Sequence, residues 1–158
     1  MTTLIGIEEE KSIILGEKLN DLLANYSIYY QNLRGFHWNI IGDKFFELHA
    51  KYEELYTLAN TAIDEIAERI LTLGSSPFHT FTDYLRVSDI KETSNIRSSS
   101  ETLRITLENL SVLLLKEREI LFIAQEANDE GTATLMSDNI KFQEKTIWML
   151  NAFLNNRK

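Results

Sequence analysis

The sequence predicts an all-α protein whose four long helices form a bundle of two hairpins joined by a long crossover. Apolar residues recur at helical spacing in four stretches of the chain. Only one proline and six glycines interrupt the 158 residues, so long helices are possible. With 44% hydrophobic residues, a chain of this length can bury the core of one domain. We therefore expect a single domain over residues 1–158.

The first hairpin comes from the N-terminal half of the chain. Its first helix is expected over about residues 8–36, where leucine and tyrosine recur on one face. Its second helix is expected over about residues 44–73, after Asp43 as a cap. Gly74 and then Pro77, the single proline, mark its end. Gly35 is expected in the break between the two helices, with His37 at the end of the first helix or just beyond it.

The second hairpin follows a crossover over residues 74–97, which is poorly periodic and should contain a short helix within residues 83–92. A third long helix is expected over residues 98–127, because Ser98 and Glu101 have the spacing of a capping box. A fourth is expected over residues 131–154, where Trp148 and Met149 are predicted to face the core. This layout is typical of ferritin-like bundles.

Composition narrows the classes of function. Asp and Glu total 24 against 16 for Lys and Arg, a formal net charge of −8, which opposes binding to nucleic acid or to anionic membranes. Cysteine is absent, so thiolate metal sites and cysteine nucleophiles are excluded. No apolar run approaches the roughly 18 residues of a membrane span, and the first residues do not resemble a signal peptide. We expect a cytoplasmic protein.

Two pairs of side chains on the second helix have the chemistry of metal ligands. His49 and Glu53 are four residues apart, as are Asp64 and Glu68, so each pair shares a helix face. Eleven residues separate Glu53 from Asp64, about 16 Å along one helix, which is too far for ligands of one ion. If both pairs serve one site, they must come from two copies of the helix. An antiparallel twofold dimer would form this site twice.

The residues in and around this helix resemble the Dps family of miniferritins, named for DNA binding in starved cells. The resemblance rests on His37-Trp38-Asn39, Gly42, Phe45, Leu48-His49, Asp64, Ala67-Glu68-Arg69-Ile70, Leu73-Gly74 and Pro77, together with the late Ile147-Trp148-Met149. It implies a dodecameric hollow shell that oxidises ferrous iron at twofold interfaces, with hydrogen peroxide as the preferred oxidant, and stores the ferric product inside. Such a protein would act in iron homeostasis and protection from oxidative stress.

The resemblance also implies a ligand set. His37, His49 and Glu53 would bind iron from one subunit, and Asp64 and Glu68 from its partner. Glu53 stands where the family more often has aspartate, and its longer side chain bears on the occupancy and spacing of a second iron. Trp38 adjoins His37 and would either intercept oxidising equivalents or pack as a buried aromatic ring. The family's acidic threefold pores would correspond to Glu126, Asp129 and Glu130, which could equally be solvated acids near a helix start.

Three alternatives remain at this stage. A metal site inside one bundle would need two Glu-x-x-His motifs, and none of His37, His49 and His79 follows a glutamate at that spacing. A DNA-compacting protein with a secondary iron role would use basic extensions, whereas residues 1–10 contain three glutamates and no lysine. The acids could also be purely structural. His79 lies outside the pattern and is expected to be a surface loop residue.

Overall fold

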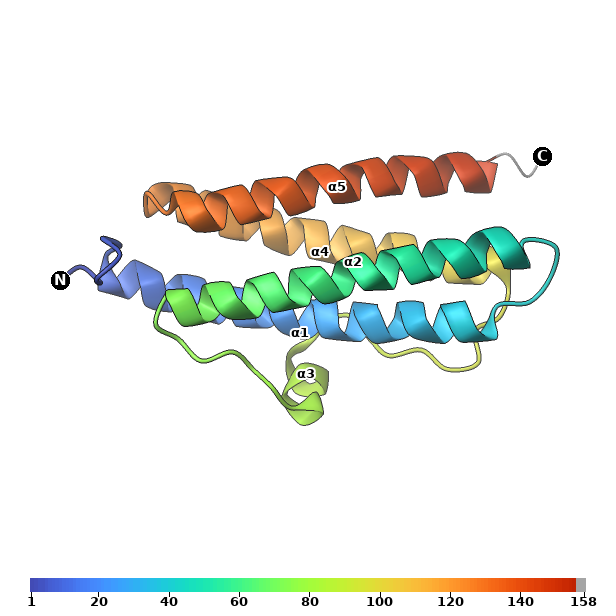
Figure 1. The fold of residues 1–158 in the computed structure, drawn as a ribbon, viewed down its shortest axis with the longest axis horizontal. Helices are drawn as coiled ribbons and strands as arrows, with labels where there is room; N and C mark the ends of the chain where they lie inside the picture. The colour runs from blue at the N-terminus through green and yellow to red at the C-terminus, as the bar shows by residue number, and fades with distance from the viewer. Residues whose placement is uncertain (156–158) are drawn as a thin grey trace.

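The computed structural model describes residues 1–155, which form five helices and no strand. They are α1 (Glu9–Asn39), α2 (Phe45–Thr72), α3 (Phe81–Val87), α4 (Ser99–Glu126) and α5 (Glu130–Asn155). Figure 1 shows the four long helices side by side with α3 projecting from the crossover next to α1. The predicted four-helix bundle with a short crossover helix is confirmed. No helix within residues 1–155 is long and apolar enough to span a bilayer.

One apolar core fills the space between the four long helices. Its largest completely buried side chains come from all the long helices except α5: Leu15, Leu19, Leu22, Leu23, Leu33, Phe36, Tyr52, Ile66, Ile70, Leu103 and Leu110. Helix α5 adds Met136, Ile140 and Leu150. Burial of such side chains contributes about 1.5–3 kcal/mol each and is the main driving force of the fold.

Two of the expected helix starts carry hydrogen-bonded caps. Ser98 Oγ accepts a hydrogen bond from the backbone N–H of Glu101 at 3.2 Å, as the capping motif predicts. Thr80 Oγ1 accepts one from the N–H of Asp83 at 3.1 Å. This second cap begins α3 at Phe81, two residues before the expected start, and α3 ends at Val87 rather than at residue 92.

Helix α1 is longer than the sequence suggested. It continues through Gly35 to Asn39, so Gly35 is helical and His37 lies in the last turn. The cost of an interior glycine is about 1 kcal/mol. Burial of Phe36 and Ile40 outweighs this cost, and the N–H of Ile40 still reaches the carbonyl of Phe36 at 3.0 Å. The bounds of α2, α4 and α5 differ from the expected ones by one residue at each end.

The C-terminal part of α5 corrects a second expectation. The side chain of Trp148 is 66% exposed, and Met149 is only partly buried, so neither belongs to the central core. The neighbouring positions Thr146 and Leu150 face the core instead.

Three buried asparagines on α1 hold the crossover against the bundle. Asn20 Nδ2 donates to the carbonyl of Ser76 at 2.9 Å, and Asn25 Oδ1 accepts from the N–H of Ile90 at 3.1 Å. Asn32 Oδ1 accepts from the N–H of Thr93 at 3.0 Å. These side chains satisfy backbone groups of a segment that has little secondary structure. The crossover is therefore fixed along α1, with α3 at its outer edge.

Candidate metal-binding site

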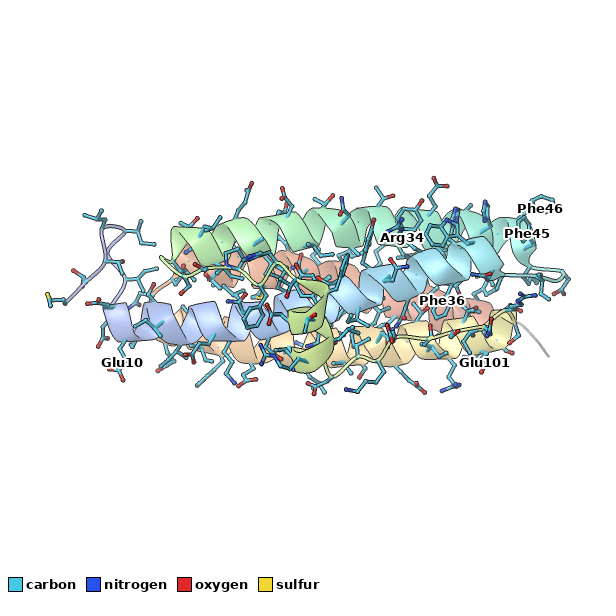
Figure 2. All side chains as sticks on the ribbon, turned by 90° about the horizontal axis from the view of Figure 1, so that it is seen from below. Glu10, Arg34, Phe36, Phe45, Phe46 and Glu101 are labelled. Atoms are coloured by element: carbon cyan, nitrogen blue, oxygen red, sulfur yellow. The ribbon has the colours of Figure 1, made fainter. Side chains whose placement is uncertain are left out.

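His37 and His49 face each other across the junction of α1 and α2. Figure 2 shows the end of the molecule where they lie, marked by Phe45 and Phe46 at the start of α2. His37 Nδ1 is 2.6 Å from the backbone carbonyl oxygen of His49, and His49 Nδ1 is 2.8 Å from that of His37. The two residues therefore exchange a reciprocal pair of hydrogen bonds.

These hydrogen bonds determine the tautomer of both rings. A carbonyl oxygen can only accept, so each Nδ1 must carry the hydrogen and donate it. Each Nε2 of the neutral ring then holds a free lone pair, and neither makes a hydrogen bond to another residue in the range 1–155. Histidines that bind metals usually donate their other ring N–H to a carbonyl or carboxylate, which orients the ring. Both histidines have this arrangement.

Aromatic packing fixes the orientation of the two rings further. Their centroids are 3.8 Å apart, with an angle of 13° between the ring planes. Phe45 stacks on the other face of His49 at 4.9 Å, and the edge of Tyr56 meets His37 at 5.4 Å. His37 is buried and His49 is partly buried. The pair is thus held rigidly before any ligand arrives.

The candidate carboxylates lie on α2 and face solvent. Glu53, Asp64 and Glu68 are all exposed, and their carboxylates form no ion pair or hydrogen bond within residues 1–155. By contrast, Glu54 on the same helix pairs with Lys51 at 2.7 Å. Unpaired acids aligned along one face of a helix repel one another, and a bound cation would relieve this repulsion.

A single chain brings together only part of the predicted ligand set. Helix α2 is continuous from Phe45 to Thr72, so Glu53 and Asp64 are separated by about 16 Å along its axis. Within residues 1–155, no three His, Asp or Glu side chains are grouped closely enough to hold a metal ion. The structure thus brings His37 and His49 together, does not group Glu53 with them, and leaves Asp64 and Glu68 at a distance.

Comparison with known proteins places this fold in a family. The ferritin-like domain family matches residues 16–158. The Dps protein from Vibrio cholerae O1, described as a member of a broad superfamily of ferritin-like diiron-carboxylate proteins, is 50% identical. Its crystal structure matches with a TM-score of 0.95 over 97% of this chain and 96% of that one. The chain belongs to the Dps family.

Other Dps proteins agree over most of the chain. The DNA protection during starvation protein of Porphyromonas gingivalis is 43% identical over 148 residues, 94% of this chain and 93% of that protein. A Dps protein from Bacillus brevis is 36% identical, with a TM-score of 0.89 and coverage of 94% and 99%.

The structure also bears on the expectations for residues outside the predicted ligand set. Trp38 is 57% exposed in the single chain, so it does not pack as a buried ring there, and the Arg34 guanidinium carbon lies 4.7 Å from the centroid of its ring. Its interception of oxidising equivalents stays a prediction. His79 is exposed in the loop before α3, as expected.

Asp129 was expected to be either a pore acid or a solvated acid near a helix start, and its burial in the single chain fits neither expectation. It is only 2% exposed, and its Oδ1 lies 2.6 Å from Arg69 Nη2. The same Oδ1 accepts a hydrogen bond from the N–H of Thr132 at 3.0 Å, so Asp129 stabilises the start of α5. Glu126 and Glu130 are exposed at the same turn and remain candidates for a pore.

Sequence reasoning missed a buried polar cluster in the centre of the Dps bundle. Glu117 is completely buried, and its Oε1 accepts hydrogen bonds from Tyr26 at 2.6 Å and from Gln143 Nε2 at 2.9 Å. Burial raises the pKa of Glu117 to about 7. The apolar spacing of α4 could have predicted this burial. Glu117 occupies a core position in the same helical spacing as Leu110, Leu113, Ile120 and Ala124.

Proposed function

We propose that this Dps protein sequesters iron by binding and oxidising Fe(II) at sites that two copies of the chain share. The observation that carries the proposal is the reciprocal hydrogen bonding of His37 and His49, which leaves two oriented Nε2 lone pairs beside an acidic helix face. Imidazole and carboxylate ligands suit iron. Hydrogen peroxide is the proposed oxidant, and the ferric product is stored inside a hollow homo-oligomeric shell, which we take to be a dodecamer.

In this proposal each residue has a defined task. His37 and His49 bind Fe(II) through Nε2, while their Nδ1–H groups stay bonded to the two carbonyls. Glu53 adds a carboxylate from the same chain, and Asp64 and Glu68 add two from the partner. Anionic ligands stabilise Fe(III) more than Fe(II), which promotes loss of an electron. Two Fe(II) ions supply the two electrons that reduce one hydrogen peroxide to water, so no hydroxyl radical is released.

The surface of α2 between the two clusters supports a twofold interface. Asn60 is seven residues after Glu53 and four before Asp64, so it shares their face of the helix. Asn60 and Ile63 also line a groove of about 420 Å³ between α1, α2 and α3. The helix face that carries both clusters is therefore continuous with a groove of suitable size for apolar side chains.

The same groove carries the apolar side chains that a second copy would insert. Helix α3 has no buried residue, and its Phe81 and Leu85 are 84% and 49% exposed along the groove. In a twofold dimer one surface supplies both the projecting side chains and the hollow that receives them. We propose that α3 of each copy packs against the groove of the other, with α2 antiparallel to its counterpart.

A complementation experiment tests the shared site. One variant carries His37→Ala and His49→Ala, and the other carries Asp64→Ala and Glu68→Ala. Each variant alone should neither bind Fe(II) at these sites nor oxidise it. When the two are co-expressed, a mixed dimer collects both mutated clusters at one site and two intact clusters at the other. With random pairing of equal amounts, about a quarter of all sites should regain activity.

The measurement begins with anaerobic addition of Fe(II), counting of bound iron per chain, and addition of peroxide while the ferric absorbance is followed. Purification through two different affinity tags verifies that assemblies are mixed. As a control, protein that carries His79→Ala should bind and oxidise Fe(II) like the unmodified protein. If verified mixed assemblies stay as inactive as the parents, the ligands belong to one chain and the shared site is refuted.

Glu126 and Glu130 are proposed to guide cations toward the shell interior. Both are exposed at the turn between α4 and α5, and copies gathered around a threefold axis would create a negative potential. The double change Glu126→Gln and Glu130→Gln should slow iron uptake at low ionic strength and have less effect at high salt. An unchanged rate at low ionic strength would remove these residues from the entry route.

The second candidate is DNA protection, which the name of the Porphyromonas relative mentions; direct binding to DNA is the form of it that can be tested here. The net charge of −8 and the absence of lysine in residues 1–10 oppose it. A gel-shift series with duplex DNA at low salt, without divalent metal, should show no complex. A retained complex at neutral pH would support the second candidate.

A further inference from the structure

One side of α2 carries a stripe of side chains whose spacing is the same in both directions. Its members follow one another at intervals of 3, 4, 4, 3, 4, 4 and 3 residues, so they share a helix face. The eight residues of this stripe are Phe46, His49, Glu53, Thr57, Asn60, Asp64, Glu68 and Leu71. The intervals repeat every 11 residues, about 3.67 residues per turn, close to the 3.6 of an α-helix. The stripe therefore runs almost straight along α2.

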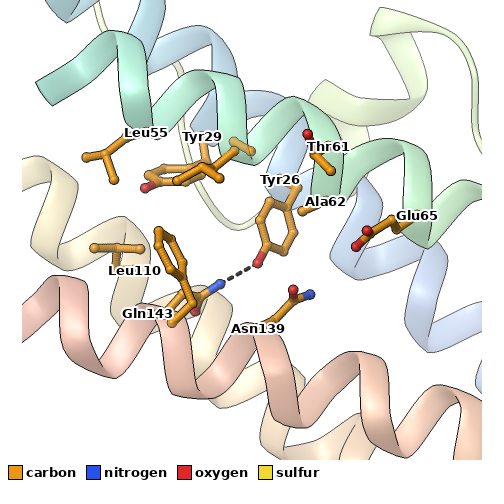
Figure 3. Close-up of a pocket in the computed structure, with 12 residues that line it drawn as sticks. Tyr26, Tyr29, Leu55, Thr61, Ala62, Glu65, Leu110, Asn139 and Gln143 are labelled. Carbon is orange, nitrogen blue, oxygen red and sulfur yellow. Dashed lines mark hydrogen bonds between the residues drawn. The ribbon is translucent and has the colours of Figure 1, made fainter. Parts of the chain in front are cut away.

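The stripe faces outward from the chain that bears it. Seven of its members are exposed, and His49 is partly buried. Other positions of α2, among them Leu55, Ala62 and Glu65, line a largely apolar cavity of about 150 Å³ that α2 shares with α5 (Figure 3). None of the eight stripe residues, all of which lie in the described part of the chain, lines this cavity. The stripe is thus open to a partner along its length.

Two antiparallel copies of a stripe with this symmetry match residue by residue. The twofold axis that achieves the match passes midway between positions 57 and 60. It places four kinds of residue opposite each other, taken from the ends of the stripe to its centre: Phe46 with Leu71, His49 with Glu68, Glu53 with Asp64, and Thr57 with Asn60. The second and third pairs are the ligands of the shared iron site proposed above, and the inference rests on that proposal.

The end pair differs from the inner pairs in being apolar. Phe46 is 81% exposed and Leu71 is 59% exposed, more than any other large apolar side chain of α2 in the described chain. The acids of the inner pairs repel one another until a cation arrives. Contact between Phe46 and Leu71 removes apolar surface from water, so it favours this one alignment even in the metal-free protein.

Phe46 also connects the interface with a proposed iron ligand. Its ring meets that of Phe45 edge-on, with centroids 5.3 Å apart and 80° between the planes. Phe45 in turn stacks on His49 at 4.9 Å. A partner side chain seated on Phe46 therefore braces the rings that orient His49.

We propose that Phe46 of each copy packs against Leu71 of the partner, and that these two contacts set the register in which the ligands of two copies meet. A slip of one helical turn would move the opposing ligands by about 5.4 Å, whereas bonds from a metal to its ligands are about 2 Å long. The same slip would return Phe46 and Leu71 to water. The apolar ends of the stripe thus select the register that the metal site requires.

Cysteine cross-linking of the metal-free protein tests this register, because the sequence contains no cysteine of its own. A short bifunctional maleimide is added to the assembled protein, and covalent dimers are counted on a denaturing gel. Phe46→Cys combined with Leu71→Cys should give mainly dimers. Either change alone should give less than about a tenth of that yield, since like positions lie about 37 Å apart along the paired helices. Thr57→Cys alone should cross-link, because it lies beside the axis.

A second set of variants tests what Phe46 contributes. In the Thr57→Cys background, Phe46→Asp should lower the yield of dimers at least about threefold, because it places a charge against an apolar side chain. Phe46→Leu should retain the yield. The control is Leu115→Asp, at a 68% exposed position of α4 outside the stripe, which should change nothing. Circular dichroism confirms that each variant keeps the helical bundle.

The proposal is overturned if the double-cysteine variant forms no covalent dimer, if either single change cross-links as well as the two together, or if Phe46→Asp leaves the yield unchanged. Because no iron is present, this result is separate from that of the iron experiments. Mixed assemblies that regain iron oxidation without cross-linking of the double variant would keep the shared site and refute the contact between Phe46 and Leu71. Cross-linking in the predicted pattern without regained oxidation would keep the contact and refute the iron site.

Discussion

Replacing Glu117 by glutamine should make this protein more stable at alkaline pH and leave it nearly unchanged at acidic pH. Glutamine has the same shape, and its side-chain oxygen can still accept from Tyr26 and Gln143. What it removes is the ability to ionise in a site with no solvent contact. Glu117 Oε2 has no hydrogen-bond partner in residues 1–155, so a negative charge there would be poorly compensated.

The magnitude follows from the pKa. Burial raises the pKa of Glu117 from 4.5 to about 7, so folding favours the protonated acid. The contribution of this group to stability is complete below pH 4.5 and declines as the pH rises through 7. At pH 8 the loss amounts to about 3 kcal/mol, at 1.36 kcal/mol for each pKa unit. For a chain of this size, 3 kcal/mol corresponds to roughly 6–12 °C in Tm.

The assay is thermal unfolding of the unmodified protein and of Glu117→Gln between pH 5 and pH 8, at one fixed protein concentration because assembly shifts Tm. The variant should gain several degrees over the unmodified protein as the pH rises. The control is Glu119→Gln on the same helix, whose ion pair with Lys18 is at the surface and should add little pH dependence. A difference in Tm that is the same at pH 5 and pH 8 would show that Glu117 does not titrate in this range.

Two further changes test the frame around the site. Ser98→Ala should lower the stability by about 1 kcal/mol through loss of the cap on α4, whereas the exposed neighbour Ser100→Ala should not; chemical denaturation of both variants measures the difference. Asp129→Asn should cost about 3 kcal/mol because it removes the negative charge that compensates Arg69 in a largely buried site, and the loss should appear as a lower Tm. Equal stability of Asp129→Asn and the unmodified protein would mean that this ion pair contributes nothing.

The long helices could be predicted because their signals are local. Apolar spacing, the Ser98 cap and the Gly74 and Pro77 stop are properties of short stretches, and they located the ends of α2 and α4 within one residue. The predicted end of α1 was wrong, because local propensity treats Gly35 as a helix breaker. Burial of Phe36 against Tyr52, with ring centroids 5.6 Å apart, is a contact between two helices that no local rule contains.

The sequence by itself determined the residue types of the proposed metal site and the 11-residue gap on α2 that prevents one chain from gathering them. Only the tertiary structure decided how His37 meets His49, because their hydrogen bonds join the end of one helix to the start of the next. It also decided that Asp129 is a buried partner of Arg69 and that Glu117 is a buried acid. Spacing along a helix fixes which side chains share a face, whereas burial and charge pairing depend on what packs against that face.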